Sequence, residues 1–531
     1  MKNAAAAKNP KWFLRDCWAE TVLSDWADAK ACWGCKMREI VSLAKQVADK
    51  VAALKSNRLN FEKSWQEISE LVLPRKADFT VAQTAGTPRT RKLFETTAVN
   101  AAELLAAGLH GLMTNPAGKW FALQTAGMSD SKPVRRWLER AERIIADEIA
   151  KPAAAFATNI HEVYLDLAVL GTAGLYVGWN EDKDCLLFQS RFLGELFISE
   201  NAAGQVDEVY RVFRLPVSKI VKTWGTDVLP ERLKTLFSQG KEEECEIIHA
   251  VLPNPLYEKG AVFQKPILSA YVLKDSQTVL FSGGFDEMPL FVVRWSKASG
   301  EVYGRSPAFS ALPDIKMLQE MMRETLIAAQ LANRPPVLVR DDDQFSPLAT
   351  VPGGVIRYNG EPPKPFSSGA NSSIGLDMMN EIRARLRTAF YNDVLMTTKD
   401  AAMTATEVLH RNEEKMRLLG PVFGRIQTEL LGPMMERVFG LLIRHGKLPP
   451  LPDALYGKMP AVSYLSPLSL AQRQVEAQAM LQTLELAEGF LRLQPDAASV
   501  FDVPKTVRKI AEMYGISEDL LHTGQREEGD V

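Results

Sequence analysis

The residues that most often catalyse reactions or bind metals are sparse in this sequence. The chain has 531 residues and only six histidines, without the spacing of metal ligands. They are His110, His161, His249, His410, His445 and His522. One C-x-x-C pair, Cys32 and Cys35, is typical of a redox site or of half a zinc site. No βαβ pattern follows it and no second pair completes a zinc site. We therefore favour a coincidence in a poorly structured leader over a thiol-dependent enzyme.

Two further stretches resemble catalytic motifs but fail in their spacing. Pro116-Ala117-Gly118-Lys119 is similar to part of a phosphate-binding loop, yet Met113 stands where the first glycine belongs and Trp120 replaces the hydroxyl residue. His161-Glu162 begins a zinc-protease pattern that Leu165 interrupts. We therefore expect no catalytic residues, no cofactor and no metal site, and the protein is not expected to be an enzyme.

The composition is that of an ordinary protein with three or four domain-sized units, 46% hydrophobic and 24% charged. A formal net charge of −2 argues against an open, strongly basic nucleic-acid binder. The most apolar stretch, Ala101 to Met113, contains Glu103 and His110, so no membrane span is predicted. The four alanines at positions 4–7 are too few for a signal-peptide core, which predicts synthesis in the cytoplasm.

The clearest pattern is a helix, an extended insert and a second helix between Tyr303 and Met396. Ser306-Pro307 predicts a capped helix start, and Pro313-Asp314 repeats that signal. Apolar residues then recur at three- and four-residue steps on two faces until about Ala332. Pro335-Pro336 ends the helix. A helix apolar on two sides needs two sets of neighbours.

The insert contains a short strand, Val337 to Val339, followed by an acidic turn and by residues rich in proline, glycine and serine. It has too few apolar residues to bury a core of its own, so copies from other subunits are expected to complete it. A second helix begins near Leu376. One stripe of it carries Met379, Ile382, Leu386, Phe390 and Val394.

The remaining chain divides by its hydrophobic period. Residues 37–170 have a helical pattern, whereas residues 171–296 alternate with period two. Helices are predicted there at Val217–Trp224 and Glu231–Ser238, and Ser282-Gly283-Gly284 is predicted as a turn. The strand-like runs are Gly174–Trp179, Cys185–Gln189, Gln205–Phe213, Cys245–Val251, Ile267–Leu273 and Leu290–Trp295.

The C-terminal part is again helical. Thr404 to Glu407 forms a capping box that opens a helix of roughly forty residues. Gly420-Pro421 and Gly432-Pro433 are expected to bend it. After a proline-punctuated stretch, a last helical region runs from Ser469 to about His522.

Several motifs, in order along the chain, resemble those of the head-to-tail connector (portal) proteins of short-tailed bacteriophages. The resemblance covers Met37 to about His522. The motifs are Arg58-Leu59-Asn60-Phe61-Glu62 with Trp65-Gln66-Glu67-Ile68 and Leu73-Pro74-Arg75, then Asn115-Pro116-Ala117-Gly118-Lys119-Trp120-Phe121, then Tyr303-Gly304-Arg305-Ser306-Pro307-Ala308, Leu312-Pro313-Asp314-Ile315-Lys316 and the Pro335-Pro336 stop.

The resemblance implies the portal fold, which is mainly α with an α+β wing and forms a dodecameric ring around a DNA channel. The implied parts are an atypical leader (1–36), the α+β wing (37–302), the first stem helix (303–332), the clip (333–375), the second stem helix (376–396), the channel loop (397–403), the long bent helix (404–446), a return segment to the wing (447–468) and the helical crown with a polar tail (469–531).

The implied function is that of a portal at one capsid vertex of the virion, made in the host cytoplasm. The ring is the channel for DNA packaging by a separate terminase ATPase and for DNA ejection, and it is the platform on which tail proteins dock. The implied partners are further copies of the chain, double-stranded DNA, the terminase large subunit, tail adaptor and tail tube proteins, and the major capsid and scaffolding proteins, with no membrane. The alternative is a helical scaffold protein without a channel.

The resemblance also supplies candidate site residues. In the channel loop, Lys399 with Thr397 and Thr398 is the candidate DNA contact; the alternative is that Lys399 pairs with Asp400 or Glu407. Arg383 and Arg387 are one turn apart and either face phosphates or pair with Glu320 or Glu324 of a neighbouring stem. In the clip, the candidates for partner docking are Asp341, Asp342, Asp343 and Lys364, the alternative being a solvated turn.

A chain that starts at Met37 is expected to assemble into rings like the full chain, because the resemblance begins there. Size-exclusion chromatography with light scattering measures the assembled mass. Loss of rings would show instead that the leader tryptophans Trp12, Trp18, Trp26 and Trp33 anchor the structure.

Overall fold

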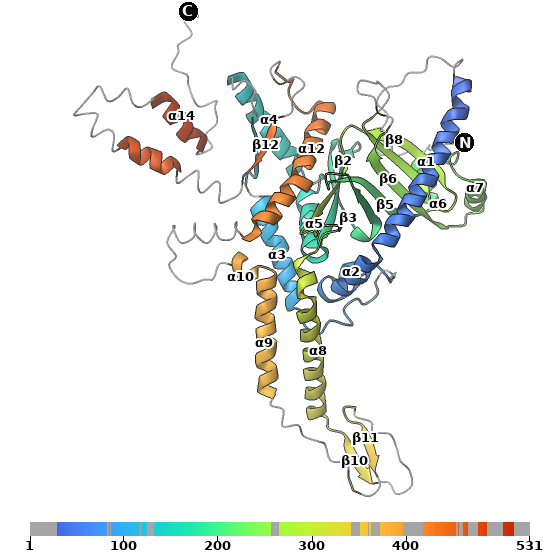
Figure 1. Cartoon of the computed structure of the whole chain (residues 1–531), viewed down its shortest axis with the longest axis vertical. Coiled ribbons are helices and arrows are strands. Elements are labelled where there is room, and N and C mark those ends of the chain that lie inside the picture. The colour runs from blue at the N-terminus through green and yellow to red at the C-terminus, as the bar shows by residue number, and fades with distance from the viewer. Residues whose placement is uncertain are drawn as a thin grey trace, which may run out of the picture.

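The computed structural model of the protein describes residues 29–81, 84, 86–116, 118–124, 132–255, 257, 265–340, 351–358, 361–362, 372–396, 418–452, 455, 460–465, 476–485 and 503–513. Figure 1 shows a mixed α and β body, two long helices that project from it side by side, and a small two-stranded sheet near their far end. No helix within these ranges has the length and apolar character needed to cross a membrane.

The N-terminal part is helical, as predicted, with one added strand. The elements are α1 (Ala29–Asn57), α2 (Leu59–Val72), a short 3₁₀ turn (Pro74–Lys76), α3 (Thr97–Met113), β1 (Phe121–Gln124), α4 (Lys132–Ala150) and α5 (Phe156–Leu170). The sequence pattern missed β1, whose antiparallel partner is the distant strand β12 (Ala461–Tyr464). The expectation of a poorly structured segment around Cys32 and Cys35 is wrong, because both lie on α1. Alanine and lysine, which favour a helix, are frequent in this segment.

Two antiparallel sheets follow. The first has the order β3-β2-β9, and the second is a meander of β4, β5, β6, β7 and β8. Their strands are β2 (Thr172–Asn180), β3 (Cys185–Arg191), β4 (Leu196–Glu200), β5 (Val206–Pro216), β6 (Glu244–Pro253), β7 (Ile267–Leu273), β8 (Thr278–Phe285) and β9 (Leu290–Arg294). The predicted turn at Ser282-Gly283-Gly284 is wrong, since these residues lie inside β8. A Cβ at Gly284 would come within 2.7 Å of Ile267 O, so glycine lets β7 and β8 approach.

Helices cover both faces of the five-stranded sheet. On β6, Ile248 and Ala250 face α1, whereas Cys245 and Ile247 face α6 (Val217–Trp224) and α7 (Glu231–Ser238). The alternation follows the two-residue period of a strand. Both short helices have their predicted bounds. The central core is built around α5, whose residues from Val163 to Leu170 are all buried.

The projecting pair consists of α8 (Pro307–Asn333) and α9 (Ser372–Ala389), and the distal sheet of β10 (Val337–Arg340) and β11 (Val355–Tyr358). The first helix continues through Pro313 without restarting. The second helix differs from the predicted range of 376–396. It ends at Ala389, because Tyr391 takes a left-handed conformation with φ of 58°, and a short helix, α10 (Asn392–Leu395), follows.

Residues 418–444 are helical, as predicted, and end in α12 (Gly432–Arg444). The α-helix runs through Gly420-Pro421 but changes to a π-helical turn at Gln427–Leu431, just before Gly432-Pro433. Pro433 has no N–H to donate to the preceding turn, and a wider turn accommodates its ring. Helical residues 476–485 and α14 (Val503–Met513) lie within the predicted C-terminal helical region. The capping box at Thr404 to Glu407 lies outside the described residues.

The start of α8 docks on the corner between α5 and β2 through backbone atoms. Gly171 ends α5 with φ of 77°, and a Cβ there would lie 2.6 Å from both Gly304 O and Ser306 N. Gly304 N donates to Thr172 Oγ1 at 2.8 Å, and Ser306 Oγ donates to Val169 O at 2.6 Å. Ser306 was expected to cap α8 with its side chain, but its hydroxyl is used for this docking instead. The segment from Tyr303 to Pro307, part of one of the family motifs, therefore forms the joint between the body and the projecting pair.

Replacing Gly304 with alanine is expected to lower the free energy of unfolding by about 1–3 kcal/mol, because the added Cβ meets the backbone of Gly171, which no side-chain rotation can relieve. Denaturant titration followed by circular dichroism measures the change.

The matched control is Gly111→Ala in α3, where a new Cβ meets nothing within 4 Å. It is expected to be neutral or to stabilise by up to about 1 kcal/mol. Equal effects of the two substitutions would contradict the proposed tight joint.

Candidate functional site

The helices α8 and α9 form the most extended feature of the molecule. At 1.5 Å per residue, the 27 residues of α8 span about 40 Å. Ile315 and Leu318 are buried on α8, as are Met379, Ile382 and Leu386 on α9. The pair also exposes large apolar side chains, with exposed fractions of 41–53%. These are Met317 and Leu326 on α8 and Leu376 and Met378 on α9. The pair thus carries more apolar surface than its own contacts bury.

A polar cluster just before α3 holds both helices to the body. Gln319 Oε1 accepts from Phe94 N at 2.7 Å and from Glu95 N at 3.0 Å, and Gln319 Nε2 donates to Glu95 O at 2.6 Å. Arg383 Nε on α9 donates to Glu95 Oε1 at 3.3 Å. One backbone segment therefore fixes the rotation of α8 through Gln319 and of α9 through Arg383.

The two arginines predicted to face the channel differ in their surroundings. Arg383 is half-buried, and besides Glu95 it donates from Nη1 to Asn380 Oδ1 at 3.0 Å. Arg387 is exposed and has no ion pair with any residue that the structure describes. Glu320 and Glu324 lie 2.8 and 3.8 Å from Arg323 of their own helix. Within one chain, Arg387 is thus the better placed of the two to meet an external group.

The channel-loop and clip candidates lie outside the described residues. These are Thr397, Thr398 and Lys399 in the loop, and Asp341, Asp342, Asp343 and Lys364 in the clip. Their flanking elements are described. The loop follows α10, whose Leu395 packs so closely on Gly108 of α3 that a Cβ there would lie 2.7 Å from Leu395 Cδ1.

The small distal sheet has almost no core. β10 and β11 pair in parallel from Val337 opposite Val355 to Arg340 opposite Tyr358. Ile356 is the one buried residue among these eight, and Val337, Leu338 and Val339 are all exposed. A two-stranded sheet of this size is marginally stable alone.

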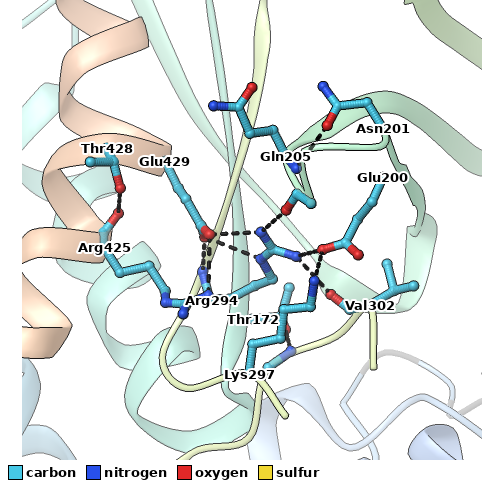
Figure 2. Close-up of polar contacts among 12 residues, drawn as sticks. Thr172, Glu200, Asn201, Gln205, Arg294, Lys297, Val302, Arg425, Thr428 and Glu429 are labelled. Carbon is cyan, nitrogen blue, oxygen red and sulfur yellow. Dashed lines mark hydrogen bonds and ion pairs between the residues drawn. The ribbon is translucent and has the colours of Figure 1, made fainter. Parts of the chain in front are cut away.

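A second polar cluster, which the sequence analysis did not identify, joins the long C-terminal helix to the sheets (Figure 2). Arg294, at the end of β9, is 1% exposed. It donates from Nη2 to Glu429 Oε1 at 2.7 Å and from Nη1 to Val302 O at 3.1 Å, and it also binds Glu200. Lys297 Nζ adds a 2.5 Å hydrogen bond to Glu200. An arginine at the end of an apolar strand run was the only sequence signal for this cluster.

This cluster lowers the pKa of one of its carboxylates, Glu200. Burial alone raises the pKa of Glu200, but hydrogen bonds from Lys297 and Arg294 outweigh it and hold that pKa below its ordinary value. Glu429, which lies in the π-helical turn, accepts from the Arg294 backbone N–H at 2.9 Å as well. The cluster therefore favours the ionised form of Glu200 beside the buried guanidinium, and its hydrogen bonds to Glu429 fix the long helix against β9.

Two of the scattered histidines do come together in the fold. The rings of His110 and His161 lie 5.8 Å apart, and His161 Nε2 is 3.9 Å from Glu103 Oε2. Burial and the charge of His161 lower the pKa of His110. Within the described ranges, no group of three or more histidine, cysteine or acidic residues is arranged to hold a metal ion.

Comparison with known proteins gives one consistent result. Residues 44–521 match the family described as bacteriophage head to tail connecting protein. The chain is 28% identical over 493 residues to the probable portal protein of Bordetella phage BPP-1, covering 89% of this chain and 88% of that protein. It is 26% identical over 503 residues to the portal protein of Salmonella phage epsilon15, covering 91% and 90%.

These findings confirm the resemblance drawn from the sequence motifs. Connecting a head to a tail is a structural role, so the protein is not an enzyme and the thiol-dependent alternative is set aside. The role also makes the protein a component of the phage particle. From its match over most of its length, the chain belongs to the bacteriophage head to tail connecting proteins, the portal protein family.

Proposed function

We propose that the protein forms a closed ring of about twelve copies at one capsid vertex, and that DNA enters and leaves the head through the ring. In this proposal α8 and α9 form the stem, residues 333–375 the clip and residues 37–302 the wing. Residues 397–403 form the channel loop, residues 404–446 the long helix and residues 469–531 the crown.

The observation that carries this proposal is the exposed apolar surface on the projecting helices. Met317 and Leu318 are adjacent on α8, yet Leu318 is buried against the body and Met317 is exposed. Apolar side chains on two faces of a helix require two sets of neighbours, and one chain supplies only one. Further copies around a ring would supply the second. The exposed valines of β10 and β11 would be covered in the same way.

Charges on the helix pair suit a surface past which DNA slides. Arg323 and Arg385 are neutralised by Glu320 and Glu381 of their own helices. DNA carries about one negative charge per 1.7 Å of its axis, so a uniformly basic bore would hold it tightly. Ion-paired charges, together with an arginine such as Arg387 that has no ion pair within the described ranges, favour weak and brief contacts.

The proposed partners are those that the family resemblance implies, and the shape suggests where each would bind. The distal end of the pair projects away from the body (Figure 1) and would receive the terminase large subunit during packaging and the tail adaptor and tail tube proteins afterwards. The broad body would contact the major capsid and scaffolding proteins.

The alternative is a helical scaffold protein without a channel. Native mass spectrometry and electron microscopy of the purified protein distinguish the two. Closed rings of about twelve copies with a central opening support the portal proposal, whereas monomers, dimers or open filaments would contradict it.

Met317→Asp is expected to abolish ring formation without unfolding the chain. The side chain is 41% exposed, so a charge costs the single chain little, within about 0.5 kcal/mol, but it would be buried between neighbouring stems. Native mass and thermal unfolding are measured on the same sample.

Phe237→Asp is the matched control, because Phe237 is 40% exposed and its helix, α7, lies away from the projecting pair (Figure 1). It is expected to leave ring formation unchanged. Normal rings from the Met317 variant would remove α8 from the proposed interface.

Lys399→Glu is expected to leave ring assembly intact but to reduce DNA packaging and retention. The effect should be larger at low salt, where screening of charges is weaker. In-vitro packaging followed by nuclease protection measures the retained DNA.

Lys219→Glu, the same charge change at an exposed position on α6, is the control and is expected to package normally. If the Lys399 variant packaged and held DNA like the parent at every salt concentration, the channel loop would not be a DNA contact.

A further inference from the structure

A cleft of about 360 Å³ lies between the two sheets of the body, and none of its lining residues lies on α8 or α9. Its walls come from β2, β3 and β9 of the first sheet, from β5, β6 and β7 of the second, and from α6. This volume is at the lower end of the range for small-molecule sites. A DNA duplex is too wide to enter it.

The cleft carries an excess of positive charge. Arg191, Arg211 and Arg214 line it, and Glu195 is the one acidic residue among its lining residues. Arg211 Nε donates to Glu195 Oε2 at 2.7 Å. Arg191 forms no ion pair with any carboxylate in the described part of the chain. It donates to the amide oxygen of Gln189, and its Nε is buried without a hydrogen-bond partner.

The charge of Arg191 is only partly compensated in the folded chain, because the nearby Glu195 carboxylate, which attracts it, pairs with Arg211. Burial, and then the charge of Arg211, lower the pKa of Arg191 to about 10, so the side chain is still cationic at neutral pH. The face of the Tyr176 ring, 5.2 Å away, offers partial compensation. His249 adds no charge, because burial and the two arginines lower its pKa to about 3. A bound anion would supply the missing negative charge.

Aromatic side chains stand beside the arginines. The ring centroids of Trp224, on α6, and Tyr271 lie 5.1 Å apart. The Cζ atom of Arg211 lies 4.2 Å from the ring centroid of Phe213. Tyr271 is stacked on His249 at 4.0 Å, which fixes this wall. Flat apolar walls with a few converging charged groups are typical of sites for small organic anions.

We propose that this cleft binds a small organic anion, with its phosphate or carboxylate group held by Arg191 and Arg211 and a flat apolar part against Trp224. The site is separate from the proposed channel and does not depend on it. Bidentate geometry makes arginine the suited partner for both oxyanions.

The test is calorimetric titration with two probes, inorganic phosphate and adenosine monophosphate, at an ionic strength matched with chloride. Wild-type protein is expected to bind both and to bind adenosine monophosphate more tightly. Arg191→Gln is expected to weaken both affinities by roughly tenfold or more. Arg191→Lys keeps the charge but not the paired donors, and an intermediate loss is expected.

A second variant separates the two halves of the site. Trp224→Leu is expected to weaken adenosine monophosphate binding several-fold and to leave phosphate binding unchanged, and it carries the test if Arg191→Gln fails to fold. Arg232→Gln on α7 is the control, since this exposed arginine pairs with Glu243 outside the cleft, and it is expected to bind like wild type.

Three outcomes would overturn the proposal. The first is that wild-type protein binds neither phosphate nor adenosine monophosphate at millimolar concentrations, and the second is that Arg191→Gln keeps both affinities. The third is binding by single chains that is lost in rings, which would show that a neighbouring copy closes the cleft.

Discussion

The projecting helices depend on one place where two backbone segments meet with no side chain between them. Gly171 and Gly304 approach so closely that neither position has room for a Cβ. The hydrogen bonds of Gly304 N and Ser306 Oγ then fix the first turn of α8 against α5 and β2. Because α8 is about 40 Å long, a small rotation at this joint would move its far end by several ångströms. A rigid joint is therefore needed to hold the far end of α8 in one position.

Buried charges in the body further restrict how the long helix and the projecting helices can be arranged. Ion pairs taken out of water contribute little net stability, but a buried partner left alone is costly, so they select one arrangement. Arg294 donates to acceptors from three separate segments (Figure 2), including Glu429 of the π-helical turn. Glu95 joins α8 and α9 to the body, because it accepts hydrogen bonds from Gln319 of α8 and Arg383 of α9. The long helix and the projecting pair are thus both held to the same core by groups that accept few alternatives.

Local signals in the sequence were sufficient for much of the fold. The bounds of α6, α7 and β7 follow from prolines, glycines and hydrophobic period alone. The misses depend on distant partners. β1 is a strand because β12 lies beside it, and α9 ends early where Tyr391 meets Trp295 across a 6.1 Å ring contact. The sequence around Gly283 and Gly284 is typical of a turn, but these glycines lie in β8 because β7 approaches them closely. The hydrophobic period of a segment carries no information about which distant segments pack against it.

The same limit applies to the charged sites. The sequence predicted that Arg383 and Arg387 lie one turn apart on a helix. It could not reveal that Arg383 forms an ion pair with Glu95, far earlier in the chain. Arg191 and Arg211 lie in different sheets, so no spacing connects them. A net charge of −2 describes only the sum over the chain. The fold divides this sum into ion pairs on the projecting helices, an Arg387 that has no ion pair among the described residues, and a cationic cleft. Since electrostatic effects weaken with distance and screening, this local division determines what each surface attracts.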